Sequence, residues 1–193
     1  MHHPALIYRQ LMLWLWLAWV LYWVVSAFSA KTTQRRESLG SRLSHVVPLL
    51  IGVALIVWPR VPWDWLSLRL LPPGPLEFAL GVVLLAPGLA FTVWARVYLG
   101  RNWSGMVTLK QGHELIRSGP YAYVRHPIYT GLLIALLGSA LQYGLVRSFL
   151  AVLTCAVGLY LKVAAEEEFM VQRFGEAYLR YRRNVNALVP FLF

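Results

Sequence analysis

The sequence predicts an all-α integral membrane protein with five transmembrane helices, a long cytoplasmic loop and a C-terminal amphipathic helix. Of its 193 residues, 59% are hydrophobic and 13% are charged, and the mean hydropathy is +0.57. Soluble domains contain about half apolar and a quarter charged residues, so this composition excludes an ordinary water-soluble protein. The charged residues also gather in a few clusters between long apolar runs, as is typical of membrane helices. We expect a single membrane domain over residues 1–193, with three N-terminal helices in 1–99 and a more polar region in 100–193.

The first two helices are expected in residues 11–30 and 43–59, which contain no Asp, Glu, Lys or Arg. At 1.5 Å per residue, a run of about 20 residues crosses a hydrocarbon core that is roughly 30 Å thick. A cleaved signal peptide is the alternative for the first run, but the run is long for a signal core and Arg9 is the only basic residue before it. The second run ends at prolines that no continuous helix accommodates, and these predict an irregular outer loop: Pro59, Pro62, Pro72, Pro73 and Pro75.

Three further apolar runs predict the remaining helices. Residues 78–95 are interrupted by Pro87, which a helix inside a bundle tolerates as a kink. Residues 126–146 and 148–161 follow, the last extending through residue 165, and the short connection between them predicts an antiparallel hairpin.

The basic residues predict the orientation. Segments 31–44, 96–126 and 162–186 lie on one side of the membrane in this topology and hold 14 of the 18 Lys and Arg residues. Because positive charge concentrates on the cytoplasmic side, we expect these segments inside and the N-terminus outside. The net charge of +10 then reflects membrane orientation and not nucleic-acid binding.

Two polar segments, 100–126 and 162–186, flank the hairpin, so the hairpin brings them to the same face and a single site can use both. Pro127 is well placed as the first residue of the fourth helix, with His126 extended before it. The free N–H groups of that helix start predict an anion site. The alternative is that the prolines only shape a loop, while Arg125 and His126 anchor it among lipid headgroups.

The second polar segment starts with Lys162 and the acidic run Glu166, Glu167 and Glu168. Acidic residues at a membrane boundary are costly unless they are solvated, paired or functional. Lys162 and Glu166 are four residues apart and share a helix face. Residues 176–183 follow with the pattern of an amphipathic helix, whose alternative role is to bind headgroups.

The sequence contains no dinucleotide-binding glycine motif, no phosphate-binding loop and no His or Cys pair with zinc spacing. Its single cysteine, Cys155, is surrounded by apolar residues and is predicted to be a small packing residue. We therefore expect no metal site and no Rossmann domain.

Short motifs in fixed order make the chain similar to a known family: His113-Glu-Leu-Ile116, Gly119-Pro-Tyr121, Arg125-His-Pro-Ile-Tyr129-Thr-Gly131, Glu166-Glu167, Phe174-Gly175, Tyr178, Tyr181 and Pro190. Over about residues 96–190 the sequence resembles the C-terminal half of the isoprenylcysteine carboxyl methyltransferases and their prokaryotic relatives. The resemblance implies an integral membrane enzyme of the prokaryotic cytoplasmic membrane, with a cytoplasmic active site in residues 100–193. It further implies S-adenosylmethionine as cofactor and methyl transfer to an isoprenylcysteine-type carboxylate or another small lipid.

The resemblance also implies which residues contact the cofactor: His113, Glu114, Leu115, Ile116, Tyr121, His126, Pro127, Ile128, Tyr129 and Glu166, with Thr108 as a weaker candidate. Lys162 stands where the family usually has an arginine that contacts the acceptor, and this puts the acceptor's identity in question. An ionised carboxylate acceptor needs only a nearby charge, for which Arg125 and Lys162 are the candidates. An amine or phenol acceptor needs a base, for which Glu167 and His113 are the candidates.

These roles agree with the chemistry of the residues. Glu166 suits the ammonium of the cofactor, the helix start at residues 126–129 suits its carboxylate, and Tyr121 suits its adenine. We expect the lipid part of the acceptor to arrive sideways from the bilayer, between the third helix and the hairpin, near Trp94, Tyr98 and Trp103. The competing interpretations are an NADPH-dependent sterol-type reductase, whose similar motif usually has an acidic residue where Leu132 stands, and a membrane protein without enzymatic activity.

Overall fold

The computed structural model describes residues 4–28, 33–58, 62–100, 103, 108–110 and 115–190. Its helices are α1 (Pro4–Ala27), α2 (Leu39–Val57), α3 (Pro75–Leu99), α4 (Pro127–Tyr143), α5 (Val146–Phe174) and α6 (Glu176–Asn184). Two short 3₁₀ helices, η1 (Asp64–Ser67) and η3 (Gly119–Ala122), lie in the connections. Strands β1 (Thr33–Arg36) and β2 (Thr108–Lys110) form a small antiparallel pair, which the sequence did not predict.

The helices α1, α2, α3 and α5 are each long and apolar enough to cross a membrane, and α4 is a shorter apolar helix. With 17 residues, α4 stands at the lower limit of about 17 residues for a transmembrane helix. The all-helical membrane fold is confirmed, as is the predicted order of five apolar helices. Helix α5 continues beyond its apolar run through the acidic residues to Phe174, which confirms that Lys162 and Glu166 lie on one helix.

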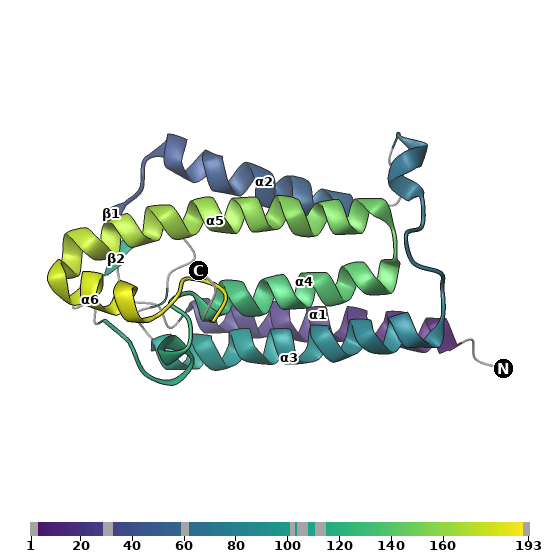
Figure 1. Cartoon of the computed structure of the whole chain (residues 1–193), viewed down its shortest axis with the longest axis horizontal. Helices are drawn as coiled ribbons and strands as arrows, with labels where there is room; N and C mark the ends of the chain where they lie inside the picture. The colour runs from purple at the N-terminus through teal and green to yellow at the C-terminus, as the bar shows by residue number, and fades with distance from the viewer. Residues whose placement is uncertain are drawn as a thin grey trace.

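The apolar helices form two groups (Figure 1). Helices α1, α3 and α4 pack together, α2 packs along α5, and the α4–α5 hairpin joins the groups at one end. The hairpin turns at Gly144, whose φ of 63° is a left-handed conformation that favours glycine.

The α3–α4 contact depends on glycines that let the two backbones meet. A Cβ atom added at Gly131 would lie 2.6 Å from the Gly88 carbonyl oxygen, and one at Gly138 would lie 2.5 Å from that of Gly81. Such small-residue contacts are a main source of helix association in lipid, where apolar side chains gain little by leaving the bilayer. These glycines therefore hold α3 and α4 at a distance that larger residues would not allow.

Side-chain hydrogen bonds attach α1 to this pair. Trp16 Nε1 donates to Ser139 Oγ at 3.0 Å, and Trp19 Nε1 donates to Thr92 Oγ1 at 2.6 Å. In the second group, Gly52 of α2 faces Cys155 of α5, which is buried as the sequence predicted for a packing residue.

The end of the bundle at the α4–α5 turn is covered by the segment that follows residue 62. Arg69 pairs in a β-bridge with Leu145, and its guanidinium lies 3.2 Å from Glu77. The predicted irregular loop is thus confirmed where it is described, and it is pinned to the hairpin turn; residues 59–61 lie outside the described part.

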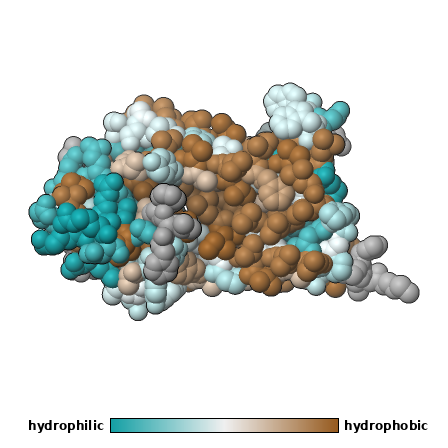
Figure 2. Space-filling view, viewed as in Figure 1, coloured by the Kyte–Doolittle hydropathy of each residue, from teal (hydrophilic) through white to brown (hydrophobic). Residues whose placement is uncertain are grey.

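The surface is apolar over the middle of the bundle and hydrophilic at the end where α5 leads into α6 (Figure 2). Helix α4 begins at that same end (Figure 1). The two polar segments singled out in the sequence therefore meet beside the apolar band.

Candidate functional site

Helix α4 starts at Pro127 as predicted, with His126 as N-cap, but the predicted extended conformation of His126 is wrong, because its φ is −124° and its ψ is 61°. The fixed φ of proline suits this position, where its missing N–H costs nothing. The Tyr129 and Thr130 amides donate to the His126 carbonyl at 3.0 and 3.1 Å. The Tyr129 bond uses one of the free N–H groups expected at this helix start, whereas the Thr130 bond is the first ordinary bond of the helix.

A segment after α6 holds this helix start in place. Asn186 forms a parallel β-bridge with Val124, and its carbonyl accepts from the Arg125 amide at 2.8 Å. The Ala187 carbonyl accepts from the His126 amide at 3.0 Å, and Thr130 Oγ1 donates to the Leu188 carbonyl at 2.6 Å. No local pattern in the sequence predicts this contact, because it joins residues about 60 positions apart.

Arg125 and Glu167 form a buried ion pair between the α4 start and α5. Arg125 Nε and Nη2 lie 2.7 and 2.6 Å from Glu167 Oε1, and both side chains are 8% exposed. Arg125 Nη1 also donates to the carbonyl oxygens of Arg182 and Val185. On the other oxygen of Glu167, Arg182 Nε lies at 3.3 Å. The Glu167 carboxylate is thus held between two guanidinium groups, an arrangement that favours its ionised form and makes it a weak proton acceptor.

Arg182 is a site residue that sequence reasoning missed. The sequence placed it in a basic tail suited to headgroups, whereas α6 folds back and brings its guanidinium to Glu167.

Glu166 is the more accessible of the two carboxylates, with 22% of its side chain exposed. Tyr129 donates its hydroxyl to Glu166 Oε1 at 2.6 Å, and His126 Nδ1 lies 3.4 Å from Glu166 Oε2. Lys162, one turn earlier on α5, holds its ammonium 5.4 Å from the centre of the Tyr129 ring, within cation–π range. The residues predicted from the two polar segments therefore converge around this carboxylate.

His126 joins the two carboxylates. Its Nδ1 faces Glu166 and its Nε2 faces Glu167, each at 3.4 Å, while its ring stacks on Tyr129. Burial alone would lower the pKa of His126, but its hydrogen bonds with Glu166 and Glu167 outweigh burial and raise the pKa above the usual value. The two carboxylates therefore favour the protonated form of the ring, which neutralises part of the negative charge on α5.

Tyr121 lies buried in η3 and connects three elements. Its hydroxyl approaches the Ala95 carbonyl of α3 at 3.4 Å, and its own carbonyl accepts from the Tyr181 hydroxyl of α6 at 2.5 Å. Burial, together with the charge of Glu166, raises the pKa of Tyr121, and burial raises the pKa of Tyr181 to about 12. Both phenols therefore stay neutral and act through packing and hydrogen bonding.

The other predicted contacts are described in part. Pro127 is buried and Ile128 half-buried in the first turn of α4, and Leu115 and Ile116 are half-buried. Leu115 and Ile116 do not form a strand; the described strand of this loop is β2, in which Thr108 pairs with Arg36. His113 and Glu114 lie outside the described residues.

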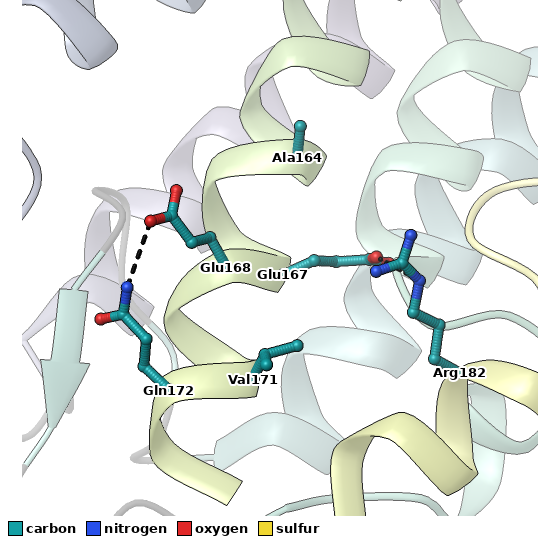
Figure 3. A pocket seen from close by; sticks show the side chains of 6 residues that line it. All are labelled: Ala164, Glu167, Glu168, Val171, Gln172 and Arg182. Atoms are coloured by element: carbon teal, nitrogen blue, oxygen red, sulfur yellow. Dashed lines mark hydrogen bonds and ion pairs between the residues drawn. The ribbon is translucent and has the colours of Figure 1, made fainter. Parts of the chain in front are cut away.

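A hollow of about 370 Å³ opens on the polar end of α5 (Figure 3). Glu167 points from α5 toward Arg182, whereas Glu168 points away and accepts from Gln172 Nε2 at 3.1 Å. The hollow is lined by Ala164, Glu167, Glu168, Val171, Gln172 and Arg182, and not by Glu166. Across the described parts of the chain, no group of three or more His, Cys, Asp or Glu is placed to hold a metal ion.

Comparison with known families adds a decisive match. The family model described as phospholipid methyltransferase matches residues 76–177, which is more than half of the chain. The match includes both the start of α4 and Glu166 on α5. The chain belongs to the phospholipid methyltransferase family.

The individual relatives include both a methyltransferase and a reductase. The chain is 34% identical over 104 residues to a protein-S-isoprenylcysteine O-methyltransferase of Schizosaccharomyces pombe, covering 51% of this chain and 43% of the relative. It is 30% identical over 132 residues to the steroid 5-alpha-reductase DET2 of Solanum lycopersicum, covering 67% of this chain and 45% of that protein. The chain thus spans about half the length of these curated relatives.

Among solved structures, the chain is similar to a eukaryotic intramembrane Ras methyltransferase, an isoprenylcysteine carboxyl methyltransferase. The TM-score is 0.51 with 20% sequence identity, over 80% of this chain and 50% of the other. At this identity the likeness supports the fold, and the resemblance seen in the sequence motifs is consistent with it.

Proposed function

We propose that this chain is an integral membrane methyltransferase that uses S-adenosylmethionine and acts on a lipophilic acceptor. The observation that supports this most is the Glu166 cluster: a partly accessible carboxylate oriented by Tyr129 and His126. The cluster lies at the polar end of an apolar helix bundle, within the segment that matches the methyltransferase family.

The residues present fit the proposed cofactor. Glu166 offers a carboxylate to an ammonium, the first turn of α4 offers the Ile128 amide to a carboxylate, and Leu115 and Ile116 offer apolar surface to adenine. When bound, the cofactor supplies an electrophilic methyl group on a sulfonium. Tyr129 and His126 hold Glu166 in one orientation, and such preorganisation lowers the entropic cost of aligning the reactants.

The ion pairs assign different roles to the predicted catalytic residues. Arg125 and Glu167 are bound to each other and to α6, so we assign them to positioning of the α4 start. Lys162, beside Tyr129 and near the bilayer, is the cation that we assign to the acceptor.

Cofactor binding tests the proposal directly. Glu166→Gln should weaken the binding of S-adenosylhomocysteine by roughly 10- to 150-fold, because a charged hydrogen bond contributes about 1.5–3 kcal/mol. Glu168→Gln is the matched control, since Glu168 points about 200° away around α5 and bonds to Gln172. Isothermal titration measures both affinities, and equal affinities would contradict the role of Glu166.

The alternative function is a membrane reductase, which the similarity to the tomato steroid reductase favours. The same titration with NADPH distinguishes a reductase from a methyltransferase. Binding of NADPH in preference to S-adenosylhomocysteine would reject the methyltransferase proposal.

We propose that the Glu166 cluster faces the cytoplasm, on the side that carries 14 of the 18 basic residues. Single cysteines at Gly40, Pro73 and Val189 test the orientation, because the native Cys155 is buried and should not react. Gly40→Cys and Val189→Cys should be labelled from the cytoplasm and Pro73→Cys from outside. Labelling of all three from one side would rule this topology out.

We also propose that the acceptor reaches the site sideways from the bilayer. Trp94 and Tyr98 lie exposed on α3, as a lipid-facing surface requires, whereas Trp103 stacks under Arg96. The glycine contact brings the α3 and α4 backbones together, which speaks against the expected entry between α3 and the hairpin and supports a route on the α5 side of α4.

A further inference from the structure

A second group of ionisable side chains lies at the start of α2. Ser41 Oγ donates to Glu37 Oε2 at 2.9 Å, and His45 Nε2 lies 3.6 Å from Glu37 Oε1. These residues recur every four positions, so they line one face of the helix start. The side chains of Glu37 and His45 are only 3% and 4% exposed.

Two polar atoms of this group lack partners. Glu37 Oε1 and His45 Nδ1 are buried without a hydrogen bond from any part of the chain that the structure describes. A buried polar atom without a partner is destabilising, so such atoms often mark a place where a ligand group completes the bonding. A carboxylate oxygen accepts hydrogen bonds, which points to a ligand that brings a donor.

The group adjoins the Glu166 cluster. Helix α2 runs antiparallel to α5, with Gly52 facing Cys155 and the His45 turn facing Gly158. Lys162 lies one turn beyond Gly158 toward the polar end, and Glu37 precedes His45 by eight residues toward the same end. Among the described residues, the antiparallel packing therefore places the pair at the level of the α5 turns that carry Lys162 and Glu166.

We propose that Glu37 and His45 take up the proton that the methyl acceptor loses, and that the acceptor therefore carries a proton on its nucleophilic atom, as in a thiol, an amine or an alcohol. This inference rests on the proposed methyltransferase function. The acceptor atom forms a bond to the methyl carbon, and the carbon–sulfur bond of the sulfonium breaks with its electron pair going to sulfur. The proton of the acceptor atom passes to the pair and ends on His45.

Charge balance favours this assignment. Uptake of one proton by a carboxylate and an adjacent imidazole converts a buried negative charge into a neutral ion pair. A buried carboxylate gains from an adjacent cation in a medium of low dielectric constant. An ionised carboxylate acceptor would have no proton to give, and such a pair would then have no part in its methylation.

Matched acceptors test the inference with the full chain in lipid nanodiscs. Hexadecanethiol, hexadecylamine and hexadecanoate share one chain length and differ in the proton on the nucleophile. Glu37→Gln and His45→Gln should lower kcat for the thiol or amine by roughly 10²–10⁴-fold and remove the acidic limb of its pH–rate profile. Affinity for S-adenosylhomocysteine should stay unchanged, as it should in the control Glu176→Gln, an exposed carboxylate paired with Arg183.

The outcomes are distinct. Variants that keep wild-type rates and pH profiles with the thiol and amine overturn the role of the pair, as does a wild type that methylates hexadecanoate alone. A wild type that binds S-adenosylhomocysteine yet methylates none of the three overturns the proposed acceptor class. A wild type that binds no S-adenosylhomocysteine overturns the methyltransferase proposal itself.

Discussion

The group of α1, α3 and α4 and the pair of α2 and α5 are built differently. The first group is joined by glycine-to-backbone contacts and by two tryptophan hydrogen bonds. The second pair also packs through glycines, at Gly52 and Gly158, but it carries the ionisable side chains: Glu37, His45, Lys162, Glu166 and Glu167.

This difference indicates that the two groups of helices have different roles in building the site. The first group presents the start of α4, with His126 and Tyr129, as a fixed platform. The second brings the carboxylates of Glu166 and Glu167 on α5 to that platform. Because charge in a membrane is costly, the gathering of these carboxylates at one end of the bundle is a mark of function.

Breaking the Arg125–Glu167 ion pair, which links the two groups of helices, should have the largest effect on stability. Arg125→Met leaves Glu167 buried without its main partner, and breaking a buried ion pair costs about 3–5 kcal/mol. Arg183→Met removes an exposed pair with Glu176 and should change stability by less than about 1 kcal/mol. Chemical unfolding in detergent compares the two variants; similar losses would mean that the Arg125 pair does not join the groups.

Weakening the glycine contact within the first group should have the next largest effect. In Gly131→Ala the new methyl meets the Gly88 carbonyl at 2.6 Å, where both partners are backbone, and overpacking costs about 1–3 kcal/mol. Gly158→Ala meets the Leu49 side chain at 2.9 Å as well as the His45 carbonyl, so part of its strain can relax. Gly40→Ala is the control, with no atom within 4 Å of the added carbon. Thermal unfolding should rank Gly131→Ala below Gly158→Ala and both below Gly40→Ala; the reverse order would refute the packing argument.

A change of pH should have the smallest effect on thermal stability. Because the pKa of His126 is raised in the folded protein, its pairing with Glu166 and Glu167 is fully present below the unfolded value of about 6.5. This stabilisation is lost as the pH rises through the folded pKa. Wild type should thus lose more thermal stability between pH 6 and pH 9 than His126→Gln, and parallel curves would show that the histidine does not bridge the carboxylates.

Much of the fold followed from the absence of charge in five runs of the sequence, because that signal depends only on the solvent around each helix. The end of α5 did not follow, since its last turns leave the apolar run and are held by contacts to Arg125 and Arg182. Proline preference predicted the start of α4 at Pro127.

The site was predictable only where motifs were contiguous or matched a family. His126, Tyr129 and Glu166 were singled out in this way, and the structure brings them together. Arg182, Asn186 and the Glu37–His45 pair were missed, because their roles arise from contacts between helices that sequence spacing does not encode.

Residues 185–188 form a clasp on the start of α4, and their late position in the chain determines when the site can form during translation. Val185 is translated 60 residues after Arg125, to which its carbonyl is bonded, and Glu167 follows Arg125 by 42 residues. At 5–20 residues per second, the ribosome needs about 3–12 s to supply the clasp. During that interval Arg125 and His126 lack their partners from residues 185–187. The site is therefore completed only after α4 and α5 have been synthesised, and a nascent chain that stops inside the hairpin lacks the clasp.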